Sequence, residues 1–328
     1  MNQGELKVFA LNAGHAYGEA VSAALGRPLA AHEEREFEDG EHKARTLENV
    51  RGCDVFVIQS LFGDAQRSVD DKLLRLLFFV GALNDASAGR VTVIAPYLAY
   101  SRKDQKSKPR DPVATRYLAT LFEAVGTDCM VTLDVHNLAA YQNAFRCRTE
   151  HLEAAPLFVE SLAPRFGSAE VVVVSPDAGG IKRADAFRQR LGRALGRPIA
   201  MAFAEKYRSA GELRGDALVG DVNGKVAIIV DDLISAGNTI ARAARACRDR
   251  GAVRVVACAS HGVFAPEADA VLAGSAVDEI LITDSIPPLR VTDLNVVARI
   301  RQVTTVPMVA EAIRRLHGGG SLAALHED

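Results

Sequence analysis

Short runs of apolar, often β-branched residues recur along the chain, and segments with helical spacing of apolar positions separate them. Continuous apolar strands are typical of parallel sheets whose two faces are both covered by helices. The alternation of such strands with helices therefore predicts an α/β fold with doubly wound sheets. The predicted strands are residues 7–11, 54–59, 91–95 and 129–133 in the first half, and 171–175, 226–230, 254–260 and 279–283 in the second.

The length of the chain and one apolar segment predict how the molecule is divided. Residues 73–83 repeat Leu73, Leu76, Leu77 and Val80 at the spacing of a core-facing helix. With 328 residues, the chain exceeds what a single core usually supports, so two tandem domains are expected. We place the boundary near residue 150, which gives an N-terminal domain of residues 1–150 and a C-terminal domain of residues 151–328. The last segment could pack back on the N-terminal domain.

Charge and cysteine content narrow the function classes. The 39 Lys and Arg residues nearly balance 41 Asp and Glu residues, so no global field would recruit nucleic acid or an anionic membrane. Five widely spaced cysteines without a CxxC pair argue against a disulfide framework and against a zinc site. The sequence shows neither a signal peptide nor an 18-residue apolar run, and we expect a cytoplasmic protein.

The segment 226–239 carries the sharpest chemical signal. An apolar strand leads into Asp231 and Asp232, and Gly237 follows before a helical pattern. This order aims backbone N–H groups and a helix N-terminus at one point, which suits a phosphate group. Two carboxylates beside it suit the hydroxyl groups of a ribose, or a magnesium ion. The same residues could merely end a strand and cap a turn, but the small residues near Gly237 favour a phosphoribose-binding loop.

Three weaker signals lie elsewhere in the chain. Asp177 follows the predicted strand 171–175 and precedes two glycines, although a plain strand–turn–helix connection would look the same. His136 follows the strand 129–133; a lone histidine is more often structural than a metal ligand, but a strand terminus favours a ligand. Lys206 and Arg208 precede a stretch rich in Gly, Ser and charge, which is either a solvated face or a lid that brings cations to a phosphoryl group.

Taken in order along the chain, these elements resemble the ribose-phosphate diphosphokinases, also called phosphoribosyl pyrophosphate synthetases. The resemblance extends nearly from end to end. Its motifs are FEDGE at 37–41, ENVRG at 48–52, ASAGR at 86–90, PYLAYSRKD at 96–104, SPD at 175–177, VDD at 230–232, SHG at 260–262 and AEAIRR at 310–315.

The resemblance implies the fold and the reaction. Both domains would have the type I phosphoribosyltransferase-like α/β fold. The enzyme would transfer the diphosphoryl group of MgATP to the C1 hydroxyl of ribose 5-phosphate, giving phosphoribosyl pyrophosphate and AMP. ATP and subunit contacts would belong to the N-terminal domain, and the protein would be a homo-hexamer built from dimers.

The resemblance also assigns roles to residues. Mg²⁺ would be held by His136 and Asp177, and the transition state would be met by Lys206 and Arg208. Asp231 and Asp232 would face the ribose hydroxyls. The remaining assignments are Ser235, Ala236, Gly237, Asn238 and Thr239 around the 5-phosphate, Arg102, Lys103 and Asp104 at ATP, and Phe37, Asp39 and Glu41 at the ATP of a neighbouring subunit.

Several positions depart from the family's usual pattern. Ser235 replaces an acid and retains a hydroxyl donor, so phosphate binding need not suffer. Asn238 replaces a second glycine, which should demand more of the backbone. Lys103 stands where Gln is usual, and Gln105 where a basic residue is common. These changes suggest a divergent member with altered regulation or a changed sugar or nucleotide preference.

Two other functions compete with the active synthetase. A non-catalytic regulatory paralogue would have no need for the cations Lys206 and Arg208, which this chain retains. A phosphoribosyltransferase shares the Asp-Asp loop, but two tandem domains and the FEDGE segment make it the weaker alternative.

Overall fold

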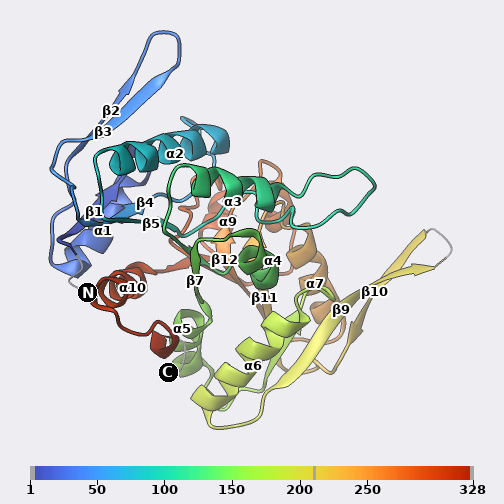
Figure 1. Ribbon diagram of the computed structural model, residues 1–328. Coiled ribbons are helices and arrows are strands. Elements are labelled where there is room, and N and C mark those ends of the chain that lie inside the picture. Colours follow the sequence, from blue (N-terminus) through green and yellow to red (C-terminus); the bar gives the residue numbers. More distant parts are fainter. Residues whose placement is uncertain (1–3, 210–211, 326–328) are drawn as a thin grey trace. The chain divides into compact units, whose positions relative to one another are not determined.

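The computed structural model describes residues 4–209 and 212–325, with the side chains of residues 205–217 left out. The chain divides into two compact units (Figure 1). Unit 1 consists of Met1–Glu153 and Thr305–Asp328, and unit 2 of Ala154–Thr304. Unit 2 is thus inserted, in chain order, between two parts of unit 1.

Unit 1 is built on a sheet of five parallel strands in the order β1-β4-β5-β6-β7. The central strands β4 and β6 are buried along their whole length, as their apolar sequences predict. The strands are β1 (Leu6–Ala10), β4 (Asp54–Ile58), β5 (Arg90–Ala95), β6 (Cys129–Leu133) and β7 (Arg148–Leu152).

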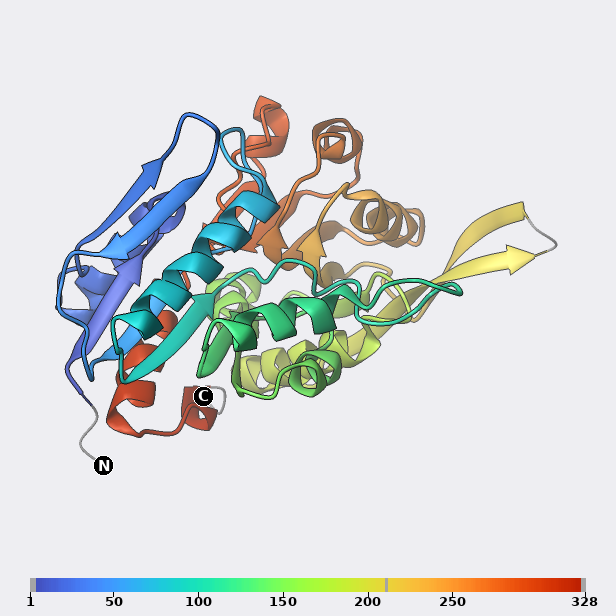
Figure 2. The ribbon, with the colours of Figure 1, turned by 45° about the horizontal axis from the view of Figure 1, so that its top comes forward.

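Helices and a hairpin complete unit 1. The helix α2 (Val69–Asp85) includes the predicted segment 73–83 and buries its apolar stripe in the core. A two-stranded antiparallel hairpin, β2 (His32–Glu36) and β3 (His42–Thr46), lies beside α2 (Figure 2). The remaining helices are α1 (His15–Leu25), α3 (Ala114–Ala124), α4 (Leu138–Ala144), α10 (Val306–Gly318) and the short η1 (Asn12–Gly14) and η2 (Ala323–Leu325).

The helix α10 is fixed to unit 1 by polar contacts as well as by packing on α1. Tyr17 Oη lies 2.6 Å from Thr305 Oγ1 at the start of α10. At its other end, His317 Nδ1 lies 2.7 Å from the buried Asp54 Oδ2, and an Arg90 N–H donates to Leu316 O at 3.0 Å. The last helix is therefore an integral part of unit 1.

Unit 2 contains a seven-stranded sheet in the order β10-β9-β8-β11-β12-β13-β14, parallel except for the antiparallel pair β9–β10. The β9–β10 hairpin extends outward from the sheet (Figure 2). The strands are β8 (Val171–Ser175), β9 (Ala200–Ser209), β10 (Glu212–Val219), β11 (Val226–Ile234), β12 (Arg254–Gly262), β13 (Glu279–Thr283) and β14 (Ile300–Val303).

Both faces of this second sheet are covered by helices. Val172 and Val174 of β8 belong to a core that includes residues of α7 (Asn238–Asp249), α8 (Ala268–Ala273) and α9 (Leu294–Val297). Val171 and Val173 are equally buried and point to the opposite face. The helix α6 (Ile181–Leu195) contacts β8, β9 and β11 and packs against α5 (Ala155–Phe166). The predicted α/β fold with doubly wound parallel sheets is confirmed.

The described part of the chain contains no helix that is both long and apolar enough to cross a membrane.

Candidate functional site

The junction between β11 and α7 is the centre of the candidate site. The strand was expected to end at Val230, but Leu233 and Ile234 still pair with β12, so Asp231 and Asp232 lie within it. Gly237 precedes α7 with a φ of 84°, and no side chain caps the first turn of the helix. The backbone N–H groups of that turn therefore lack the side-chain oxygen that usually meets them at a helix start.

The loop of this junction, residues 235–237, is supported from outside. Backbone N–H groups of Phe264 and Ala265 donate to Ile234 O and Ser235 O at 2.9 and 3.1 Å. A Cβ added at Gly237 would lie 3.0 Å from Leu272 Cδ2, so the loop is also closely packed. The loop is thus held by its carbonyl groups and by packing.

A buried polar cluster lies behind that support. His261 Nδ1 is 2.8 Å from Ser285 Oγ, and Thr283 Oγ1 donates to Ser260 O at 2.6 Å. All four residues are buried at the ends of β12 and β13. The SHG motif at 260–262 therefore has a structural role just before the residues that hold the loop.

Two acids and one arginine meet at the end of β11. Arg183 Nη1, from the first turn of α6, lies 3.2 Å from Asp231 Oδ1 and 3.3 Å from Asp232 Oδ1. The N–H of Asp232 also donates to Asp231 Oδ1 at 2.9 Å. The Asp231 side chain is 18% exposed and that of Asp232 is 5% exposed.

This arrangement perturbs the proton affinity of the acids. Burial, followed by the proximity of Asp232, raises the pKa of Asp231 to about 8, while Arg183 acts in the opposite direction. Near neutral pH the two acids therefore hold a proton between them that an exposed pair would have lost.

The junction between β8 and α6 places Asp177 one strand away from β11 in the same sheet. Asp177 Oδ1 accepts the N–H of Gly180 at 3.1 Å, and Ser175 Oγ donates to Asp177 O at 2.6 Å. Asp177 therefore closes the turn before α6. The carboxyl ends of parallel neighbours share one edge of a sheet, so Asp177 and the two acids of β11 lie at the same edge.

In unit 1, His136 is exposed just after β6. Its neighbour Asn137 caps α4 by accepting the N–H of Ala140, and it donates to Asp104 Oδ2 at 2.7 Å. The predicted metal residue and one predicted ATP residue thus lie close together. His136 and Asp177 lie in different units, so neither unit by itself contains the predicted metal pair.

The predicted ATP segment forms a loop fixed by an ion pair. Lys103 Nζ lies 2.5 Å from Asp111 Oδ2, which also accepts the N–H groups of Ser107 and Lys108. The hydrogen bond from Lys103 lowers the pKa of Asp111. Lys103 is therefore engaged within the loop, while Arg102 is exposed.

Phe37, Asp39 and Glu41 lie at the tip of the β2–β3 hairpin. The N–H of Phe37 donates to Glu41 O at 2.8 Å, and Asp39 Oδ1 accepts the N–H of Glu41 at 3.0 Å. All three side chains are exposed. The side chains at this tip are therefore accessible to solvent.

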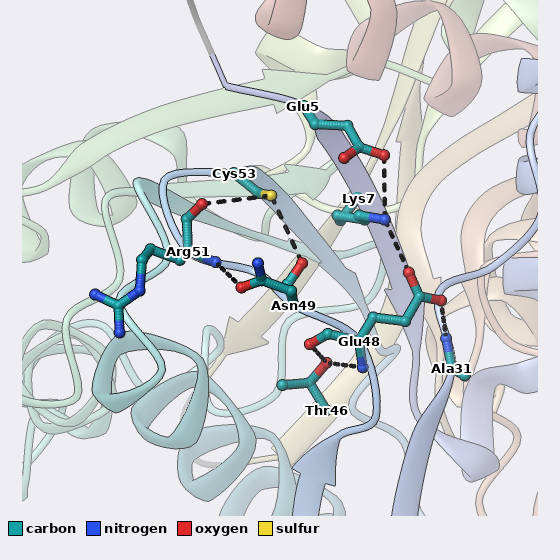
Figure 3. Close-up of polar contacts among 8 residues, drawn as sticks. All are labelled: Glu5, Lys7, Ala31, Thr46, Glu48, Asn49, Arg51 and Cys53. Carbon is teal, nitrogen blue, oxygen red and sulfur yellow. Dashed lines mark hydrogen bonds and ion pairs between the residues drawn. The ribbon is translucent and has the colours of Figure 1, made fainter.

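The ENVRG motif has mainly structural contacts (Figure 3). Lys7 Nζ lies between Glu5 and Glu48, at 3.1 and 2.9 Å, and Glu48 Oε1 accepts the N–H of Ala31 at 2.7 Å. Asn49 Oδ1 accepts the N–H of Arg51 at 3.1 Å. The hydrogen bond from Lys7 lowers the pKa of Glu48. Glu48 thus joins β1 to the segments that flank the hairpin.

Lys206 and Arg208 lie on β9, opposite Asp216 and Leu213 of β10. Their side chains are outside the described part of the structure, so their predicted role stays a prediction. The stretch that suggested a lid or a solvated face is an antiparallel hairpin.

Two residues of the site were missed by sequence reasoning. Arg183 lies 48 residues before its partner Asp231, and Asp111 lies 8 residues after Lys103. The KR pair after Gly179 and Gly180 was visible, but nothing in the sequence indicated which acid it would meet.

The donor set fits magnesium better than a metal held by protein alone. No group of three His, Cys, Asp or Glu side chains within residues 4–204 and 218–325, whose side chains are described, could hold a metal ion. Asp177, Asp231 and Asp232 offer carboxylate oxygens at one sheet edge. Mg²⁺ commonly binds through one or two carboxylates together with water and substrate phosphates, which suits such a set.

The α/β units, with acids and an uncapped helix start at one sheet edge, define a protein of the phosphoribosyltransferase-like fold class. Residues 6–126 match the model of the N-terminal domain of ribose phosphate pyrophosphokinase, and residues 211–327 match the phosphoribosyl synthetase-associated domain. The chain belongs to the ribose-phosphate pyrophosphokinase family.

Individual relatives agree with this assignment over the full length. The ribose-phosphate pyrophosphokinase of Granulibacter bethesdensis is 38% identical over 98% of this chain and 100% of its own. That of Caldanaerobacter subterraneus is 37% identical over 98% of this chain and 97% of its own. The crystal structure of phosphoribosylpyrophosphate synthetase from Mycobacterium smegmatis superposes with a TM-score of 0.86 at 32% identity, covering 96% of this chain and 100% of that one.

Proposed function

We propose that the protein is a ribose-phosphate diphosphokinase, which transfers the diphosphoryl group of MgATP to the C1 hydroxyl of ribose 5-phosphate. The products are phosphoribosyl pyrophosphate and AMP. The observation that carries the proposal is the β11–α7 junction, where two acids precede a glycine at φ 84° and an uncapped helix start. Full-length relatives of the same family support the reaction type.

The sugar would bind along this junction. Asp231 and Asp232 would accept hydrogen bonds from the 2- and 3-hydroxyl groups of the ribose, because carboxylates pair well with adjacent hydroxyl donors. The 5-phosphate would meet the N–H groups of residues 235–239, where the helix dipole favours negative charge. This pose would direct the C1 hydroxyl away from the loop.

The phosphoryl transfer itself depends on position and charge. Asp177 and His136 would hold Mg²⁺, which would neutralise charge on the ATP phosphates. Lys206 and Arg208, on the β9–β10 hairpin, would stabilise charge that develops in the transition state. No covalent enzyme intermediate is needed.

ATP would bind to unit 1. Arg102 would contact the nucleotide, and Asp104 would do so from its position beside Asn137. Lys103 would mainly fix the loop through Asp111. The exposed tip residues Phe37, Asp39 and Glu41 would complete the ATP site of a neighbouring subunit. The assembly would be a cytoplasmic homo-hexamer built from dimers.

A coupled assay of AMP release tests the proposal. Protein supplied with ATP, Mg²⁺ and ribose 5-phosphate should form AMP and phosphoribosyl pyrophosphate, and omission of the sugar should abolish both. Asp232→Asn should lower activity by at least an order of magnitude, whereas Asp221→Asn, at an exposed acid of the same unit, should not. Folded protein that releases no AMP at saturating substrates would favour the regulatory paralogue instead.

A further inference from the structure

Arg183 lies at the sugar end of unit 2, and neither the family pattern nor the reaction assigns it a task. It lies in the first turn of α6, whereas the acids that it contacts lie on β11. A single nitrogen, Nη1, is within 3.3 Å of both Oδ1 atoms. The side chain is 29% exposed, so its charge is partly shielded from water.

The two acids of β11 need a positively charged neighbour. Two adjacent carboxylates with side chains 18% and 5% exposed repel each other and lose hydration. The groups that act on the ionisation of Asp231 are Asp232 on its own strand and Arg183 from the helix packed against it. Arg183 and the backbone N–H of Asp232 favour the charged form of Asp231, whereas the Asp232 carboxyl group opposes it.

The contacts also orient the carboxyl groups. Oδ1 of Asp231 is engaged twice, by Arg183 and by the N–H of Asp232. These two contacts fix the orientation of the Asp231 carboxyl group. A guanidinium group presents several N–H donors in one rigid plane, so it fixes acceptor positions more firmly than an ammonium group would.

We propose that Arg183 is a positioning residue for the sugar: it holds the carboxyl groups of Asp231 and Asp232 in place to meet the adjacent 2- and 3-hydroxyl groups of a pentose 5-phosphate. This inference rests on the proposed function, because it takes that sugar phosphate as the ligand. Arg183 acts through Asp231 and Asp232 and need not touch the substrate. It therefore governs sugar affinity and selectivity for a vicinal diol more than turnover.

Arg183→Gln tests the inference, with Arg183→Lys as the conservative variant. Calorimetry should show ribose 5-phosphate binding to Arg183→Gln at least tenfold more weakly, with the KM for ATP changed less than twofold. Arg183→Lys should recover part of the affinity. Arg193→Gln, in the last turn of the same helix, is the matched control and should bind like the wild type.

A double-mutant cycle with Asp231→Asn separates positioning from a general structural effect. If Arg183 acts through the acids, Arg183→Gln should cost less than threefold in affinity once Asp231 is neutral. Equal losses in both backgrounds, or binding of Arg183→Gln within twofold of the wild type, would overturn the inference. Circular dichroism and thermal unfolding verify the fold, and Arg183→Lys decides the case if Arg183→Gln is unfolded.

The two proposals fail in different ways. Wild-type protein that binds ribose 5-phosphate but releases no AMP would overturn the proposed function alone. The double-mutant cycle measures sugar binding, so it would still test the role of Arg183. Wild-type protein that does not bind the sugar phosphate would overturn both.

Discussion

Two junctions of the unit 2 sheet have the same order of strand, acid, glycine and helix, yet they differ in what they leave available. At the β8–α6 junction, Asp177 Oδ1 accepts the N–H of Gly180, and Ser175 donates to Asp177 O. At the β11–α7 junction, no side chain caps the helix, and the acids are held by Arg183 from another element. The first junction is closed by its own residues, and the second is open to a ligand.

The number of residues between the acid and the glycine explains why only the β8–α6 junction is capped by its own side chain. Asp177 stands three residues before Gly180, a separation at which a carboxylate reaches back to the backbone N–H. Asp232 stands five residues before Gly237 and is still within β11, paired to β12 at its flanks. Its carboxylate is therefore directed by the sheet and by Arg183. Of these two junctions, only the one with the shorter separation between acid and glycine is capped by its own acid.

The largest effect is expected from Gly237→Ala, which should distort the open junction. A side chain at φ 84° is strained, and the added Cβ would lie 3.0 Å from Leu272 Cδ2, so the free energy of unfolding should fall by about 3 kcal/mol. Ribose 5-phosphate should bind at least tenfold more weakly. Gly196→Ala, at φ 65° in open space, should destabilise by about 1 kcal/mol and leave binding unchanged. Urea unfolding measures the stability of the two variants, and calorimetry measures their binding of ribose 5-phosphate. If both variants lost the same amount of sugar affinity, the difference drawn between the two junctions would be wrong.

Asp231→Asn should stabilise the protein at alkaline pH while weakening the sugar site. The folded pKa of Asp231, about 8, lies above its ordinary value of 3.8, so between these values the folded state holds a proton that the unfolded state has released. This group's contribution to stability is therefore present at low pH and is lost as the pH rises toward about 8. The variant should be more stable than the wild type by about 2 kcal/mol at pH 9.

Urea unfolding at pH 5 and pH 9 measures this effect. The difference between variant and wild type should be clearly smaller at pH 5 than at pH 9, because Asp231 of the folded wild type is still neutral at pH 5. Asp221→Asn serves as a control. The hydrogen bond from Lys225 lowers the pKa of Asp221, so this variant should not be more stable than the wild type at pH 9. A pH-independent difference between Asp231→Asn and the wild type would refute the assignment.

A smaller effect should distinguish the two tasks of Asp177. Asp177→Ala removes the acceptor for the N–H of Gly180 and should destabilise by about 1 kcal/mol, whereas Asp177→Asn keeps an acceptor and should cost less than about 0.5 kcal/mol. If Asp177 also holds Mg²⁺, both variants should lose activity and need more Mg²⁺ for half-maximal rate. Full activity of Asp177→Asn would show that Asp177 only caps the turn and does not hold Mg²⁺.

The smallest effect is expected at Asn238. Its replacement of a glycine was expected to demand more of the backbone, but the positive φ falls on Gly237, and Asn238 is the first helical residue of α7. Asn238→Gly should therefore lower the free energy of unfolding by only about 0.5 kcal/mol. The affinity for ribose 5-phosphate, measured by calorimetry, should stay within twofold of the wild type. A tenfold gain in affinity would show that Asn238 does strain the loop, as the sequence suggested.

Sequence patterns predicted the buried strands well and the exposed hairpins poorly. Every predicted strand exists, because an uninterrupted apolar run leaves few other structures possible. The β2–β3 hairpin was missed since its strands, HEERE and HKART, are short and polar and contain no apolar run. The second part of the β9–β10 hairpin was assigned to a lid or a solvated face because the stretch is rich in Gly, Ser and charge.

In the candidate site, too, some features could be predicted from the sequence and others could not. The acids of β11 and Gly237 are adjacent in sequence, so local spacing sufficed to predict them together. The Arg183 contact depends on how α6 packs beside β11, and the Asp111 contact depends on how the 103–111 loop folds. Neither follows from the order of residues along the chain.

The position of α10 in unit 1 has a consequence for biosynthesis. Helix α1 and the buried Asp54 emerge from the ribosome early, but their partners Thr305 and His317 are among the last residues to be made. Unit 2 can complete its sheet as soon as residue 304 is available, while the first unit must wait for the end of translation. A truncated chain that ends at residue 304 should therefore have a protease-resistant second half and an exposed, chaperone-binding first half.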